Sequence, residues 1–79
     1  MKTRPIRILA FSAAKQWVPS GELTVEAEPS ETLAQIIART LPELPASSMR
    51  VALDHEYAAW DSPLGTASEL AIIPPVSGG

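Results

Sequence analysis

Residues 32–41 have the spacing of an amphipathic helix, and every other periodic segment of the chain alternates as a strand does. Leu33, Ile36, Ile37 and Leu41 recur at helical spacing and form one apolar stripe. Because a lone helix buries such a stripe economically only against a sheet, the remaining segments must supply the layer that it covers. This single helix constrains the fold more than any other feature of the sequence.

Both ends of this helix are marked by residue type. Thr32 and Gln35 match a capping box, in which the hydroxyl accepts a backbone N–H and the glutamine side chain reaches back to the cap. Ser30 is the competing cap. Pro42 disfavours helical backbone at the residue before it, so we expect the helix to end at residues 40–41.

Two segments before the helix and three after it are predicted to be strands. They are residues 5–11, 21–28, 49–53, 57–60 and 69–73. The first strand places Leu9 and Phe11 on its wetter face beside Arg7, so both are expected to be partly exposed. Ile73 lies on the side of the last strand away from Leu70. Residues 12–19 form a connection with one helical turn.

The element order is therefore β-β-α-β-β-β in a chain of 79 residues, which makes one domain with one core. The first two strands form a hairpin, and the helix crosses so that the last strand lies beside the first. This order predicts an α+β fold of the β-grasp, or ubiquitin-like, architecture, with a mixed sheet of about four to five strands on one main helix. We expect residues 1–73 to form this domain and residues 74–79 an extended tail.

Composition excludes several classes of function. The chain has no cysteine, which excludes disulfides, thiolate metal sites and a cysteine nucleophile, and fits a reducing compartment. Its net charge is −3 and its six basic residues form no stripe, so no nucleic-acid partner is expected. Arg7 interrupts the apolar residues near the N-terminus, so neither a signal peptide nor a membrane partner is expected, and the predicted location is the cytoplasm. His55 lies in a polar turn and is expected to be solvated, with no metal site.

The most distinctive functional feature is the segment that follows the last strand. It consists of Pro74, Pro75, Val76, Ser77, Gly78 and Gly79. The prolines end strand pairing and favour a stiff extended backbone, and the segment could reach about 15–20 Å beyond the domain. Because glycine has no Cβ, the two terminal glycines fit a slot that is too narrow for other residues. The pattern predicts delivery of the Gly79 carboxylate into a partner's active site; a linker remnant or a disordered terminus is the alternative at this point.

The last twenty residues or so resemble the small subunit of molybdopterin synthase. The resemblance rests on the turn of the D-x-P-L kind at residues 61–64, the acidic Glu69, the apolar strand and the ending P-P-V-x-G-G. It departs from that family at residues 54–56, where many members have an asparagine-containing turn, and at Trp60, where phenylalanine or valine is more common. Neither departure touches the chemistry of the tail.

The resemblance implies a non-catalytic sulfur-carrier subunit that binds no cofactor itself. A ubiquitin-activating-type adenylyltransferase would use ATP to adenylate Gly79, and a sulfurtransferase system would convert it to a thiocarboxylate. The tail would enter the large catalytic subunit and donate sulfur to cyclic pyranopterin monophosphate. In this family the assembled synthase is a heterotetramer of large and small subunits.

The resemblance also suggests where partners dock. Phe11, Tyr57 and Ile73 would form an apolar patch around the base of the tail, and Lys15 lies where related carriers contact the activating enzyme with a basic residue. From the residues alone, core positions for Phe11 and Tyr57 and a solvated Lys15 remain open.

Two further functions compete with molybdopterin synthesis. A carrier of the same fold could serve thiazole, tungsten-cofactor or amino-acid sulfur transfer, or protein conjugation, and residues 74–76 alone favour the molybdenum pathway. A plain ubiquitin-like interaction module, with an inert tail, is the second alternative. A truncation that removes Gly78 and Gly79 would leave such a module functional.

Overall fold

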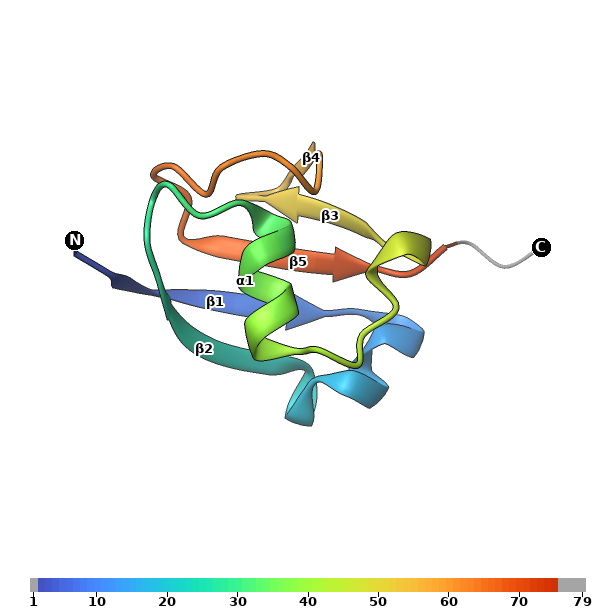
Figure 1. Cartoon of the computed structure of the whole chain (residues 1–79). Coiled ribbons are helices and arrows are strands. Elements are labelled where there is room, and N and C mark those ends of the chain that lie inside the picture. The colour runs from blue at the N-terminus through green and yellow to red at the C-terminus, as the bar shows by residue number, and fades with distance from the viewer. Residues whose placement is uncertain (1, 76–79) are drawn as a thin grey trace.

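The computed structural model describes residues 2–75 and shows one helix lying across one face of a five-stranded sheet (Figure 1). The strands are β1 (Arg4–Ala10), β2 (Glu22–Ala27), β3 (Arg50–Leu53), β4 (Glu56–Ala58) and β5 (Glu69–Ile73). The main helix is α1 (Leu33–Thr40), and short 3₁₀ turns are η1 (Ser12–Trp17), η2 (Pro19–Gly21) and η3 (Ala46–Ser48). The predicted β-grasp fold and element order are confirmed.

The sheet has the strand order β2-β1-β5-β3-β4. β1 and β2 form the predicted antiparallel hairpin, with Ile6 opposite Val25. β5 lies beside β1 and runs parallel to it, with Ile8 opposite Leu70, while the β3–β5 and β3–β4 pairs are antiparallel. Because the chain crosses over through α1, its first strand, β1, and its last strand, β5, lie side by side inside the sheet.

The helix begins and ends where the sequence predicts. The Thr32 hydroxyl accepts the Gln35 backbone N–H at 3.1 Å, and the Gln35 side chain accepts the Thr32 backbone N–H at 2.9 Å. Regular helix ends at Thr40, two residues before Pro42. The stripe that faces the sheet is buried, whereas Ala34 and Ala38 face solvent. The capping box is thus confirmed as the start of α1.

The core lies between α1 and one face of the sheet. Its fully buried large side chains are Ile6, Ile8, Val18, Leu33, Ile36, Ile37, Val51, Leu64, Leu70 and Ile72. Alternation along β1 and β5 decides which side chains enter it, because successive residues of a strand point to opposite faces. Within residues 2–75 no polar side chain is buried, so the core is purely apolar.

The D-x-P-L turn closes the beginning of the helix. The backbone N–H of Leu33 donates to Ser62 O at 3.0 Å, and that of Ala34 donates to Trp60 O at 2.9 Å. The N–H of Leu64 donates to Glu31 O at 2.8 Å, and the Leu64 side chain is buried. The bonds from Leu33 and Ala34 satisfy N–H groups that the first helical turn leaves unpaired. The D-x-P-L turn therefore has a structural role in this fold.

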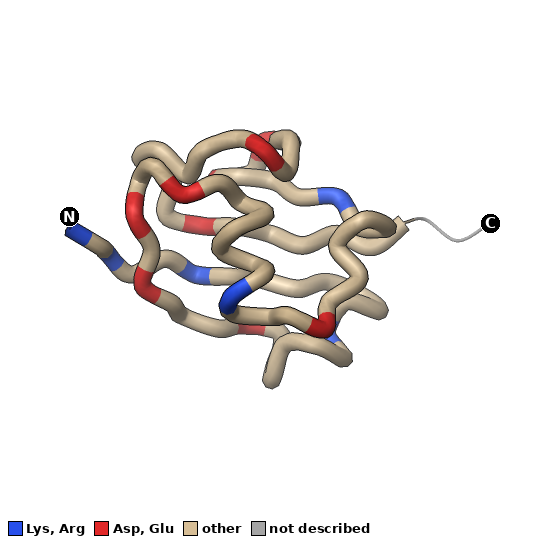
Figure 2. The backbone as a smooth tube through the Cα atoms, in the orientation of Figure 1, with Lys and Arg blue, Asp and Glu red and all other residues tan. Residues whose placement is uncertain are grey.

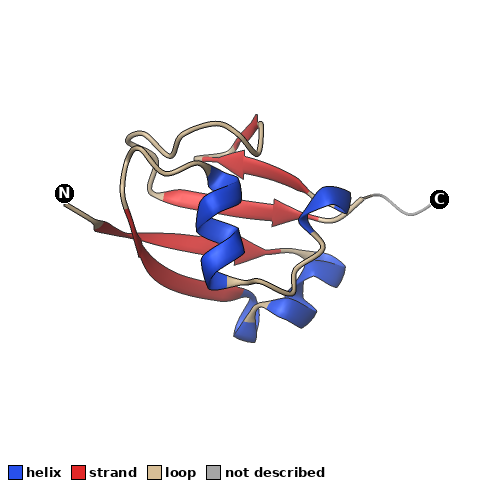
Figure 3. Cartoon of the chain, viewed as in Figure 1, coloured by secondary structure: helices blue, strands red, loops and turns tan. Residues whose placement is uncertain are grey.

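The bounds of β1, β2 and β3 differ from the predicted ones by one residue at one or both ends, and two larger differences follow. The fourth strand covers Glu56–Ala58 rather than residues 57–60, because the chain turns at Ala59 and the Trp60 indole Nε1–H donates to Met49 O at 3.1 Å. The segment between the helix and the third strand, for which no regular element is predicted, contains η3. The short helical turns gather at the end of the sheet where β5 finishes (Figure 3).

Candidate functional site

The root of the predicted tail is the end of β5. Ile73 is the last paired residue of that strand, opposite Arg50 of β3. Pro74 and Pro75 follow without strand structure, and Pro75 is exposed. Proline has no N–H to donate to a ladder, which explains why pairing stops here. The predicted tail residues Val76, Ser77, Gly78 and Gly79 lie outside the described residues.

The sheet face opposite α1, here called the open face, is apolar in its middle. A cross-strand row of paired positions runs from Leu9 on β1 through Ala71 on β5 and Ala52 on β3 to Tyr57 on β4. Small alanines at the centre leave a hollow of about 310 Å³. Its lining residues are Leu9, Phe11, Ala52, His55, Tyr57, Glu69, Ala71 and Ile73. An exposed apolar hollow of this kind suits protein docking.

Three of the four predicted partner-binding residues lie around this hollow. Phe11 and Tyr57 are 47% and 69% exposed, the large hydrophobic residues with the greatest exposure in the described chain. Ile73 completes the set at the root of the tail. Lys15 does not line the hollow; it lies on η1, where its aliphatic carbons pass beside Gly21. The structure therefore joins Phe11, Tyr57 and Ile73 on one surface and places Lys15 outside it.

An ion-pair network borders the open face on the side away from the tail. The Arg7 guanidinium lies 2.7 Å from a Glu69 carboxylate oxygen and 3.4 Å from Glu22. His55 Nε2 lies 3.5 Å from the other Glu69 oxygen, and its side chain is 87% exposed. The expectation of a solvated histidine agrees with this exposure. The network joins residues of β1, β2 and β5 to the β3–β4 turn and gives the apolar hollow a charged rim.

The polar turn at residues 54–55 holds His55 in place. Asp54 and His55 both have positive φ, 46° and 75°, the backbone geometry of a tight hairpin turn. The Asp54 carboxylate accepts the backbone N–H groups of Ser68 and Glu69, each at 3.1 Å, and its own N–H donates to Glu69 O at 3.0 Å. Asp54 therefore clamps the turn to the start of β5, which keeps His55 beside Glu69.

Arg50 is the charged residue nearest the root of the tail along β3. Its guanidinium carbon lies 5.7 Å from the centroid of the Tyr57 ring, a cation–π distance. Sequence reasoning missed Arg50, Glu69 and the two central alanines as parts of this surface. Alternation along β3 and β5 places Arg50, Ala52, Glu69 and Ala71 on one face, and that signal could have found them.

The strongly shifted ionisable group in the described chain lies elsewhere. Arg39 hydrogen-bonds both oxygens of Glu31 at 2.7 and 2.8 Å, and the Glu28 backbone N–H adds a further bond. These bonds hold the pKa of Glu31 at about 2, below its usual 4.5. Arg39 also donates to Glu26 O at 2.7 Å. This cluster ties α1 to the end of β2 and is structural.

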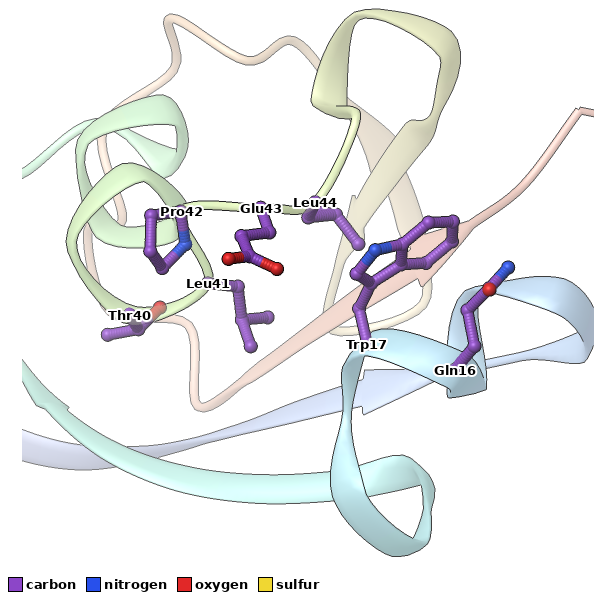
Figure 4. Close-up of a pocket in the computed structure, with 7 residues that line it drawn as sticks. All are labelled: Gln16, Trp17, Thr40, Leu41, Pro42, Glu43 and Leu44. Carbon is purple, nitrogen blue, oxygen red and sulfur yellow. The ribbon is translucent and has the colours of Figure 1, made fainter.

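A second hollow lies between η1 and the segment after α1 (Figure 4). In that view Trp17 of η1 lies on one side of the hollow, and Leu41 and Glu43 lie on the other. Trp17 and Trp60 are both partly buried against the core, so the expectation of packing roles agrees with their positions. Within residues 2–75 no three histidine or acidic side chains come together in a way that could hold a metal ion. The same residues include no helix long and apolar enough to span a membrane.

Comparison with known proteins identifies the family. The solved structure of SAMP1 from Haloferax volcanii superposes with a TM-score of 0.75 over 96% of this chain and 100% of that one, at 21% identity. This likeness shows a shared fold. Residues 8–79, which include the strands of the open face and the tail sequence, match the ThiS family. The chain therefore belongs to the ThiS family, as a protein of the sulfur-carrier type with the ubiquitin-like β-grasp fold.

Proposed function

We propose that this carrier is the sulfur-donating small subunit of molybdopterin synthase. The observation that supports this function best is the sequence Pro74-Pro75-Val76 at the end of β5, followed by Ser-Gly-Gly. The wider family shares the fold and the glycine pair, whereas the Pro-Pro-Val approach resembles this subunit in particular. The D-x-P-L turn that closes α1 is a second shared motif.

The chemistry is carried by the carboxylate of Gly79. An adenylyltransferase of the ubiquitin-activating type joins this carboxylate to the α-phosphate of ATP, and pyrophosphate leaves. A sulfide equivalent from a sulfurtransferase then displaces AMP and leaves a thiocarboxylate. Its sulfur is a strong nucleophile at neutral pH, and it reacts with cyclic pyranopterin monophosphate in the active site of the large subunit.

The domain contributes position to this chemistry. β5 is held between β1 and β3, so the root of the tail has a fixed direction relative to the open face. A partner that encloses the tail must therefore cover the adjoining apolar hollow with Phe11, Tyr57 and Ile73. Burial of this surface supplies binding free energy without touching the reacting atoms. Within a heterotetrameric synthase, one small subunit would dock in this way on each large subunit.

The experiment is a reconstitution in two stages. The purified chain is first incubated with an adenylyltransferase of this type, ATP and a sulfur donor, and thiocarboxylate is followed by intact mass. The thiocarboxylated chain is then mixed with the large subunit and cyclic pyranopterin monophosphate. We expect the precursor to be converted to molybdopterin while the chain returns to its carboxylate mass.

A Gly79 deletion is the matched control, because it leaves the β-grasp domain intact. Thiocarboxylate that forms but reacts only in thiazole or tungsten-cofactor synthesis, or an isopeptide conjugate to other proteins, would overturn the molybdopterin assignment while keeping the carrier role. A chain that keeps its biological effect without Gly78 and Gly79 would be an interaction module instead.

A further inference from the structure

Arg50 lies beside the point where the tail leaves the domain. It is paired with Ile73, the last residue of β5, in the antiparallel ladder between β3 and β5. Paired residues of adjacent strands point to the same face and lie about 4.5–5.5 Å apart. Arg50 therefore stands on the open face, and it is exposed.

The Arg50 guanidinium can bind a carboxylate of another protein. The guanidinium carbon of Arg50 lies over the Tyr57 ring, 5.7 Å from the centroid, which is within cation–π range. A cation–π contact does not use up the N–H groups of a guanidinium, which can still donate to a carboxylate. Arg7 and Arg39 each bind a carboxylate within the chain, whereas among residues 2–75 no carboxylate lies within ion-pair distance of Arg50.

A protein that encloses the tail from Pro74 onward has to cover Arg50 as well. Covering a cation without a partner group is costly, because its hydration is lost and nothing replaces it. The covering surface must therefore supply an acceptor with negative charge. The acidic positions of this chain lie mostly in the part of the domain away from the C-terminal end (Figure 2). An acidic partner surface is therefore repelled less at the C-terminal end than elsewhere on the domain.

We propose that Arg50 is a specificity-determining contact that pairs with a carboxylate of the activating enzyme at the mouth of its tail-binding channel. The inference rests on the proposed carrier function and names the chemistry of the partner's surface. Arg50 acts on docking and takes no part in the adenylation step. Arginine suits this position better than lysine, because only the planar guanidinium can bind a carboxylate through two parallel N–H groups.

The test uses the full chain with the adenylyltransferase encoded by the same genome. Pyrophosphate exchange with ATP gives KM and kcat for the wild type, Arg50→Glu and Lys2→Glu, and titration calorimetry gives Kd without turnover. Lys2→Glu is the matched control, because it makes the same charge change before β1, at the end of the sheet away from the tail. Urea unfolding checks that each variant is folded, and Arg50→Met replaces Arg50→Glu if the latter is not.

We expect Arg50→Glu to raise KM and Kd about tenfold at low salt, which corresponds to about 1.4 kcal/mol, with kcat near the wild-type value. The difference should shrink as salt screens the pair, and Lys2→Glu should resemble the wild type. Exchanging the enzyme's carboxylate for lysine should restore the affinity of Arg50→Glu.

Equal KM and Kd for Arg50→Glu and the wild type would overturn the inference, while adenylation of the wild type would still support the carrier function. A loss in kcat alone would also overturn it, since docking would then be intact. If the wild type neither binds nor is adenylated, both the carrier function and this inference fail.

Discussion

Replacement of Tyr57 by alanine should weaken binding to the large subunit much more than it lowers the free energy of unfolding. Tyr57 is 69% exposed and its ring contacts the Arg50 guanidinium rather than the core. A tyrosine side chain presents roughly 200 Å², so about 140 Å² of it is available to a partner. At about 25 cal/mol per Å², complete burial contributes at most about 3.5 kcal/mol. Ordering of the side chain and imperfect burial reduce this, so we expect a loss of about 2 kcal/mol, or about thirtyfold in Kd.

The same substitution should affect folding much less. It removes an exposed cation–π contact, worth about 0.5–1 kcal/mol, and leaves no cavity in the core. We therefore expect the free energy of unfolding to fall by less than about 1 kcal/mol. Glu56→Ala is the matched control, because Glu56 is an exposed neighbour on the same short strand whose side chain points to the other face.

Titration calorimetry with the large subunit measures Kd, and urea unfolding measures stability. A Kd that stays at the wild-type value for Tyr57→Ala would refute the docking role of the open face. A stability loss of about 3 kcal/mol or more would show that the ring belongs to the core, as Phe and Trp truncations in cores do.

Three further outcomes are expected. Gly78→Val should melt as the wild type does but should not be adenylated, because a Cβ no longer fits a slot made for glycine; normal activation measured by pyrophosphate exchange would contradict this. Thr32→Ala removes the acceptor for the Gln35 N–H and should lower the free energy of urea unfolding by about 1 kcal/mol; an unchanged unfolding midpoint would argue against the cap. Glu31→Gln should be less stable than the wild type at neutral pH, because Arg39 and the Glu28 N–H stabilise the charged carboxylate and lower its folded pKa from 4.5 to about 2. That contribution is present above pH 4.5 and is lost as pH falls toward 2, so the stability gap, followed by urea unfolding across this range, should narrow in acid; a constant gap would contradict the assignment.

Much of the fold could be predicted because local signals and burial agree. The capping pair at Thr32 and Gln35, the proline after the helix and the alternation along β1 and β5 each depend on neighbours in sequence. One helix and one core then leave few arrangements of the strands. The predicted bounds of the fourth strand are wrong because the Trp60 indole N–H donates to Met49 O. This contact joins two segments of the chain, and the alternation pattern of one segment cannot predict it.

The open face was only partly predictable for a related reason. The end of strand pairing before Pro74, the exposure of Phe11 and the partial exposure of Ile73 follow from patterns within single segments. The cation–π contact of Arg50 with Tyr57 and the place of Arg50 beside the tail depend on the registers of β3 with β4 and β5, in which Ala52 pairs with Tyr57 and Arg50 pairs with Ile73. Such registers are set by tertiary packing, so the sequence alone did not assign Arg50 to the surface around the tail.

Intact mass of the protein isolated from its native host, under gentle non-reducing handling, tests the central claim most directly. The account predicts a fraction in which sulfur replaces one oxygen, with the change confined to the C-terminal peptide that ends at Gly79. A chain that stays unmodified, even when an adenylyltransferase, ATP and a sulfur source are supplied, would contradict the sulfur-carrier function and favour conjugation or simple binding.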